Sequence, residues 1–202
     1  VYRIFKAPGI YPRFTKDRPD DQDSSILFCV AAAFTDLSDY KVDGFHLVEG
    51  ARDSLEPTNK SLGGAYLLRN QQVSLIDTKK GSIFTDSLIE VLQRDSASVF
   101  QQILMIIDGK VEPMKKQKFF QRRALVTNNK GESYFIENTD PKTLKQFCEG
   151  ALEVDSTIQF ALYLDMGGWD EGWWRYSRDS VVTIGLGRNA TAFQSNWVYF
   201  KK

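Results

Sequence analysis

The feature that most constrains this chain is a succession of short apolar runs separated by turn residues. About nine of these runs have the length and composition of strands, and two longer segments carry apolar residues at helical spacing. The runs at residues 26–34 and 158–164 are continuously apolar, which predicts strands that are buried on both faces. The pattern therefore predicts an α+β fold, with a mixed β-sheet and a few flanking helices.

Turn residues and capping residues predict where these elements begin and end. Turn signals between apolar runs predict three hairpins, with turns at residues 69–72, 108–109 and 128–131. Ser82 is predicted to cap the first helix. The second helix is predicted to be capped by Thr139 or Asp140, with Pro141 at its first helical position.

The length and apolar content predict one domain over residues 1–202. A chain of 202 residues that is 42% hydrophobic can bury one substantial core. Residues 1–25 read as a short strand followed by a polar loop. The loop contains Asp20, Asp21 and Asp23, but it lacks the glycine and glutamate of a calcium-binding loop, so a solvated acidic loop is expected. Because the chain begins at Val1 rather than methionine, a preceding segment is expected to have been removed.

The balance of charge excludes several partners. The chain has 26 basic and 26 acidic side chains, so its formal net charge is zero and a duplex nucleic acid is not an expected partner. One local cationic group departs from this balance, and its members are Lys115, Lys116, Lys118, Arg122 and Arg123. No run approaches the roughly 20 apolar residues that a membrane-spanning helix needs, so no transmembrane segment is expected.

The low count of histidine and cysteine limits the chemistry. His46 is the only histidine, and its apolar neighbours predict a half-buried position in a strand. Cys29 and Cys148 are too few for a structural zinc site, and we expect no metal and no cofactor. The two cysteines are compatible with one disulfide or with two buried thiols. Any catalysis must therefore depend on carboxylates and arginines.

The most informative segment follows the apolar run at residues 158–164. That strand delivers Asp165 to a sheet edge, where Gly167 and Gly168 allow the backbone to approach a ligand. The neighbouring residues that suit a sugar ligand, through aromatic faces or carboxylates, are Trp169, Asp170, Glu171, Trp173 and Trp174. The alternative is a glycine-rich turn whose tryptophans pack into the core.

The order of these parts resembles the phosphodiester glycosidase family. The matching parts are a strand ending in Asp-Gly at 108–109, a strand led by arginine at 122–126, a helix, a strand ending at 165–168, and a last strand led by Asn196. The resemblance covers roughly residues 26–202 and is clearest from Gly63 onward. It implies cleavage of a glycosidic bond to phosphate, and an extracytoplasmic location that is either periplasmic or secreted.

Carried over position by position, the resemblance assigns the catalytic roles to Arg122 and Asp165. It adds Gly167, Gly168 and Asn196 as substrate-binding residues. The guanidinium of Arg122 would hold phosphate oxygens, and Asp165 would act as an acid, a base or a nucleophile. The other interpretation of Arg122 is a solvated surface cation within the local cationic group.

Three departures from the family pattern support a second hypothesis. Met166 replaces a glycine, Trp169 replaces a serine, and residues 30–34 replace a segment that contains asparagine. A chain that has lost these groups is expected either to retain degenerate glycosidase activity or to bind carbohydrate without turnover. In the second case it would be a glycan-binding or envelope scaffold domain, with Trp169, Trp173 and Trp174 as its platform. The enzyme hypothesis requires Arg122, Asp165 and Asn196 to converge.

Overall fold

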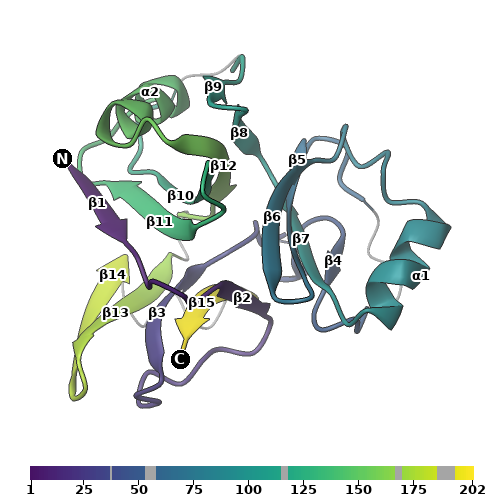
Figure 1. The fold of residues 1–202 in the computed structure, drawn as a ribbon, viewed down its shortest axis with the longest axis horizontal. Helices are drawn as coiled ribbons and strands as arrows, with labels where there is room; N and C mark the ends of the chain where they lie inside the picture. Colours follow the sequence, from purple (N-terminus) through teal and green to yellow (C-terminus); the bar gives the residue numbers. More distant parts are fainter. Residues whose placement is uncertain (37, 53–57, 115–117, 167–169, 186–193) are drawn as a thin grey trace.

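The computed structural model describes residues 1–202 except 37, 53–57, 115–117, 167–169 and 186–193. Its strands form three sheets, and two helices lie against them (Figure 1). The α+β class is confirmed. One mixed sheet was expected, but every strand pairing in the described part of the chain is antiparallel and the strands are divided among three sheets. The reason is that tight hairpins join many neighbouring strands, and a hairpin makes its two strands antiparallel.

The six-stranded sheet lies between helix α2 and the five-stranded sheet (Figure 1). In spatial order its strands are β1 (Tyr2–Phe5), β11 (Ser133–Asn138), β10 (Arg123–Asn128), β12 (Ile158–Leu164), β8 (Leu104–Ile107) and β9 (Lys110–Val111). The hairpins predicted at residues 108–109 and 128–131 are both present. Asp108 and Gly109 both have positive φ, which matches the right-handed twist of the flanking strands.

Helix α2 (Leu144–Val154) covers the outer face of this sheet with Phe147, Cys148 and Ala151. It begins later than predicted. Thr143, rather than Thr139 or Asp140, is its cap, and Thr143 and Gln146 form a reciprocal capping box. The reason lies outside the local sequence, because Lys142 pairs with Phe120 in an antiparallel bridge, and this pairing keeps Lys142 out of the helix.

The five-stranded sheet contains two strands that were not predicted. In spatial order its strands are β14 (Ser180–Gly185), β13 (Glu171–Ser177), β3 (Ile26–Ala31), β15 (Trp197–Lys201) and β2 (Pro12–Thr15). The sequence pattern predicts a polar loop for the segment of β2, and a glycine-rich turn is one of the two alternatives that it leaves for the segment of β13. A proline in β2 and two charged side chains in β13 weaken the strand pattern in the sequence. Both segments nevertheless form strands, because β2 pairs with β15 and β13 pairs with β3.

The four-stranded sheet carries helix α1 (Asp86–Arg94) on its outer side (Figure 1). In spatial order its strands are β4 (His46–Leu47), β7 (Ser98–Gln102), β5 (Gly64–Arg69) and β6 (Gln72–Asp77). The hairpin predicted at residues 69–72 is confirmed. The helix is capped by Thr85 and not by Ser82, because Phe84 packs on Phe45 at 4.4 Å between ring centroids and stays outside the helix.

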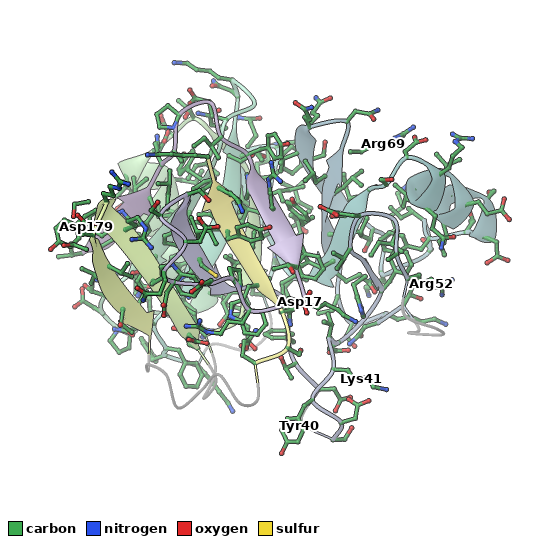
Figure 2. All side chains as sticks on the ribbon, turned by 90° about the horizontal axis from the view of Figure 1, so that it is seen from below. Asp17, Tyr40, Lys41, Arg52, Arg69 and Asp179 are labelled. Atoms are coloured by element: carbon green, nitrogen blue, oxygen red, sulfur yellow. The ribbon has the colours of Figure 1, made fainter. Side chains whose placement is uncertain are left out.

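One apolar core joins the three sheets. It contains side chains from each sheet, including Phe28 and Phe135, whose rings stack at 4.5 Å, and Tyr66 and Phe100 at 5.0 Å. His46 is fully buried rather than half-buried. In the described part of the chain, no helix is long and apolar enough to cross a membrane. Figure 2 shows Tyr40 and Lys41 on a loop that projects from the sheets, and Asp179 at the far end of the β13–β14 hairpin.

Both cysteines are free, so the structure favours two buried thiols over a disulfide. Cys29 lies in β3 and Cys148 lies in α2, on different sides of the six-stranded sheet. Burial raises the pKa of the Cys148 thiol to about 12. The group is therefore protonated at neutral pH, as expected for a cysteine that acts as a small apolar side chain.

Candidate active site

The ends of β10 and β12 bring the two predicted catalytic residues to one place. Arg123 pairs with Leu164 in the antiparallel ladder, so Arg122 and Asp165 follow directly across from each other. Opposed residues of two neighbouring strands point to the same face of the sheet. That face is the one covered by α2, because the pair two positions along the ladder, Ala124 and Tyr163, shares it and packs with the residues of α2.

Arg122 is a buried cation and not a surface one, since only 7% of it is exposed. Its Nη2 donates to the carbonyl of Lys118 at 2.7 Å, and its Nε donates to the carbonyl of Lys142 at 3.4 Å. Its Nη1 donates to the phenol oxygen of Tyr163 at 3.2 Å. These contacts use three of the five guanidinium N–H groups, and all three acceptors are uncharged. No carboxylate pairs with Arg122 among the residues that the structure describes.

Tyr163 belongs to this group, although the sequence analysis did not select it. It is buried, and its ring packs against Phe34 at 5.8 Å between centroids. Burial raises the pKa of its phenol, Arg122 opposes that rise, and the charge of Asp165 adds to it. The phenol therefore remains neutral at physiological pH and lies within electrostatic reach of both residues. Its position two residues before Asp165 in β12 was the available signal, because alternate residues of a strand share a face.

Asp165 is held where two sheets meet. Its backbone N–H donates to the carbonyl of Ala32 at 3.0 Å, just beyond the end of β3. Asn196 fixes the next residue of that segment, because its Oδ1 accepts the N–H of Ala33 at 2.6 Å and its Nδ2 donates to the carbonyl of Ala33 at 3.2 Å. The structure thus gathers Arg122, Asp165 and Asn196 in one region. The amide of Asn196 is occupied by backbone, so its observed role is to position that backbone.

Asp170, a predicted substrate ligand, instead pairs with Arg123. Arg123 is fully buried on the opposite face of the sheet, and its Nη1 donates to Asp170 Oδ1 at 2.7 Å. Its Nε donates to Glu137 Oε2 at 2.8 Å. The outer edge of this network is Arg3, which forms an ion pair with Glu137. The Arg123 network therefore ties the six-stranded sheet to the chain that leads into β13.

Glu171 and Trp173 lie on the outer face of the five-stranded sheet. Glu171 Oε1 accepts two hydrogen bonds from Arg18, and the same guanidinium lies 4.9 Å from the ring centroid of Trp173. Trp173 is 3% exposed, so it offers no open platform to a sugar. Trp174, on the other face of β13, is 41% exposed and lies 6.0 Å from the ring of Tyr176. Gly167, Gly168 and Trp169, the remaining predicted ligands, lie outside the described residues.

The described residues that surround Arg122 and Asp165 carry groups that can bind an anion. Across the described chain, no three side chains of histidine, cysteine, aspartate or glutamate are grouped closely enough to hold a metal. Arg122 supplies a fixed positive charge, Tyr163 supplies a neutral hydroxyl, and Asp165 supplies a carboxyl group. A cation, a hydroxyl donor and a carboxyl group can together bind a phosphate ester and handle one proton.

Comparison with solved structures finds the same fold in a glycosidase. The chain superposes on the catalytic domain of zebrafish N-acetylglucosamine-1-phosphodiester alpha-N-acetylglucosaminidase, which is described as auto-inhibited by its pro-peptide, with a TM-score of 0.55. The two sequences are 12% identical over 88% of this chain, and the match spans 64% of the length of the zebrafish chain. No family model matches the chain, and no curated protein matches it. The likeness is one of fold.

Proposed function

We propose that this chain is a phosphodiester glycosidase-like hydrolase that cleaves the glycosidic bond of a sugar 1-phosphodiester. The observation that carries the proposal is the environment of the Arg122 guanidinium. It is buried and held by three uncharged acceptors, and it lies across the ladder from Asp165. The shared fold with a glycosidase that acts on phosphodiesters supports the same assignment. The proposal treats residues 1–202 as one such domain, and the family resemblance places it in an extracytoplasmic compartment.

Arg122 is proposed to bind the phosphodiester. A buried cation is stable only when polar groups replace its hydration, and here two backbone carbonyls and one phenol do so without cancelling its charge. The positive charge is therefore available to an anionic ligand. The planar guanidinium matches two phosphate oxygens, and its attraction for the leaving group grows as the glycosidic bond breaks and negative charge moves to the phosphate.

Asp165 is proposed to act at the anomeric carbon. In the overall reaction, the bond between the anomeric carbon and the phosphate oxygen breaks, and water supplies a hydroxyl to the sugar and a proton to the products. Asp165 either takes the proton from that water or first attacks the carbon itself. The configuration of the released sugar distinguishes the two, because direct attack by water inverts it and a covalent intermediate retains it. Because phosphate is a good leaving group, no strong general acid is required.

A second candidate function is glycan binding without turnover. The exposed faces of Trp174 and Tyr176 are the observation that favours it, because adjacent exposed aromatic rings on one strand can stack on sugar rings. This platform is defined by Trp174 and Tyr176, since Trp173 is buried. If this function is correct, substituting Trp174 by alanine removes carbohydrate binding, and substituting Asp165 changes nothing.

The deciding experiment is an assay of phosphate monoester release from an N-acetylglucosamine 1-phosphodiester. We expect turnover by the wild type, and a loss on the order of a thousandfold in Asp165→Asn, which keeps the shape of the side chain but removes its acid–base and nucleophilic chemistry. Asp108→Asn is the matched control, because Asp108 is exposed in the β8–β9 turn and the change is equally conservative. Turnover unaffected by Asp165→Asn contradicts the proposal, as does no turnover with Trp174-dependent glycan binding.

A further inference from the structure

Phe119 and Phe120 are two consecutive phenylalanines that the fold leaves in solvent. They are 62% and 53% exposed, whereas every other phenylalanine in the described part of the chain is buried or half-buried. Single exposed apolar side chains are common on protein surfaces, but adjacent large ones mark a surface that interacts with something. The packing of the fold does not explain why this pair is exposed.

The backbone that carries the two rings is fixed by hydrogen bonds. We call residues 118–121 the aromatic ridge. Arg122 Nη2 donates to the carbonyl of Lys118 at 2.7 Å, and Phe120 exchanges two backbone hydrogen bonds with Lys142, at 3.2 and 2.8 Å. Consecutive residues of extended backbone point to opposite sides, so both rings can be exposed only where the segment stands out from the body of the protein. An ordered segment therefore presents the rings.

Cations surround the aromatic ridge. Residues 113–121 contain three lysines and no acidic residue, and Lys118, which the structure describes, is exposed. Lys142 is opposed to Phe120 in the bridge, so the two side chains point to the same side. Asp140, an acid near Lys142, is already paired with the N-terminal amino group at 2.7 Å. The ridge is therefore a positive region of a chain whose net charge is zero.

The composition of the ridge distinguishes between classes of partner. Interfaces between proteins are depleted in lysine and enriched in tyrosine, tryptophan and arginine. Single-stranded nucleic acids bind to cations and aromatic rings in a groove that follows their backbone, and a protruding ridge has no such groove. Lysine beside phenylalanine is typical of segments that lie in the interface of an anionic membrane. Both the charge and the apolar side chains of the ridge match this last partner.

We propose that the aromatic ridge is a docking surface for a lipid membrane that carries negative charge. Phe119 and Phe120 enter the boundary between head groups and acyl chains, while Lys118 and Lys142 stay at the level of the lipid phosphates. Binding is peripheral and reversible, because two rings and a few lysines bury far less apolar area than a membrane-spanning helix. The proposal is independent of the hydrolase activity proposed above, because it requires no contact with a reacting group.

The aromatic surface on the β13–β14 hairpin provides an internal control. Tyr176 is 60% exposed, which is close to the exposure of Phe119. In the adjacent turn Arg178 is followed by Asp179, so the cation there has an acid beside it. If exposed aromatic area alone caused membrane binding, Tyr176→Ala and Phe119→Ala would have equal effects. If charge and apolar area act together, only the change in the ridge has an effect.

Co-sedimentation with phospholipid vesicles measures the binding. We expect the wild type to bind vesicles made of equal parts phosphatidylcholine and phosphatidylglycerol, and to bind pure phosphatidylcholine at least about tenfold more weakly. Phe119→Ala is expected to weaken binding to the anionic vesicles about tenfold through the loss of apolar area. This variant leaves the contact between Phe120 and Arg122 in place. Tyr176→Ala is expected to leave the binding unchanged.

A second pair of variants tests the charge. Lys118→Gln is expected to weaken binding to the anionic vesicles about fivefold, which is the usual contribution of one lysine near an anionic surface. Lys80→Gln is the matched control, because Lys80 is exposed in the turn that follows β6. Raising the salt concentration is expected to weaken binding of the wild type, because salt screens exposed charges.

Several results would overturn the docking surface. They are an absence of binding to the anionic vesicles, equal binding to both kinds of vesicle, and equal effects of Phe119→Ala and Tyr176→Ala. Binding to a thymidine oligonucleotide that depends on Phe119, without binding to vesicles, would assign the ridge to a single-stranded nucleic acid. Circular dichroism of each variant checks that the fold is intact.

Discussion

Arg122 and Arg123 are adjacent in the chain, equally cationic and both buried, yet their surroundings differ. Arg123 is held by the carboxylates of Glu137 and Asp170, which neutralise it within the interior. Arg122 is held by two backbone carbonyls and a phenol, which satisfy hydrogen bonds without cancelling the charge. Because neighbouring residues of a strand point to opposite faces, one charge enters the interior between two sheets and the other faces α2.

The acceptors around each arginine distinguish a structural buried arginine from one that is available for chemistry. A cation that is paired on all sides fixes the position of its partners, and removing it leaves buried anions without compensation. A cation held only by neutral groups keeps its attraction for an anion that arrives later. By this criterion Arg123 belongs to the fold, and Arg122 belongs to the candidate active site.

The largest expected effect is on folding, in Arg123→Met. We expect the free energy of unfolding to fall by about 3–5 kcal/mol, because Glu137 and Asp170 would remain buried without a counter-charge. Urea denaturation followed by tryptophan fluorescence measures it. Arg3→Met is the control, since Arg3 also pairs with Glu137 but its side chain is 53% exposed, and its loss is expected to be below about 1 kcal/mol. Equal losses in the two variants would mean that the Arg123 network does not join the sheets.

The second prediction concerns activity in Arg122→Lys. This change keeps the charge but removes the planar pair of donors, so we expect turnover of the phosphodiester to fall on the order of a hundredfold. A p-nitrophenyl glycoside, which carries no phosphate, is expected to lose much less. Comparing kcat/KM on the two substrates isolates the role of the phosphate. Equal losses on both substrates would show that Arg122 supports the structure of the site and does not contact the leaving group.

The smallest effect is expected in Tyr163→Phe, which removes the phenol that accepts from Arg122. At neutral pH we expect a loss of about 1 kcal/mol in the free energy of unfolding, from one buried hydrogen bond.

The difference in the free energy of unfolding between the wild type and Tyr163→Phe is expected to depend on pH. Burial raises the pKa of Tyr163 in the folded state. The stability contributed by the neutral phenol is therefore complete below the unfolded pKa of about 10, and is lost as the pH rises through the folded pKa. Tyr163→Phe lacks this titration, so the difference in stability between wild type and variant should shrink as the pH rises above about 10. Denaturation at a series of alkaline pH values measures it. A difference that is constant with pH would mean that Tyr163 ionises equally in both states.

The hairpins were predictable because their signals are local. Asp108 and Gly109, and Asn70 and Gln71 in the β5–β6 turn, adopt positive φ within a few residues of the strands that they connect. The start of α2 was not predictable in the same way. Thr139, Asp140 and Thr143 are all competent caps, and the bridge between Lys142 and Phe120 selects the last of them.

In the candidate site, too, some features follow from residues near in sequence and others depend on long-range pairing. Asp165 was predictable as the acidic end of a buried strand, and Arg122 was selected through the resemblance to the phosphodiester glycosidase family. Asp170, Glu171 and Trp173 were grouped with them because they are near in sequence. Their segment forms a strand in a second sheet, where alternation and pairing with β3 carry Glu171 and Trp173 to the outer face.

Local patterns were sufficient for the class of the fold, for the hairpins, and for the placing of an aspartate at a strand end, because each depends on residues within a few positions. Which charges are neutralised depended on long-range packing. The partners of Arg123 lie 14 and 47 residues away in the chain, and a phenol 41 residues away completes the surroundings of Arg122. Two neighbouring arginines with the same intrinsic chemistry acquire different roles because the folded sheets bring carboxylates to one of them and neutral acceptors to the other.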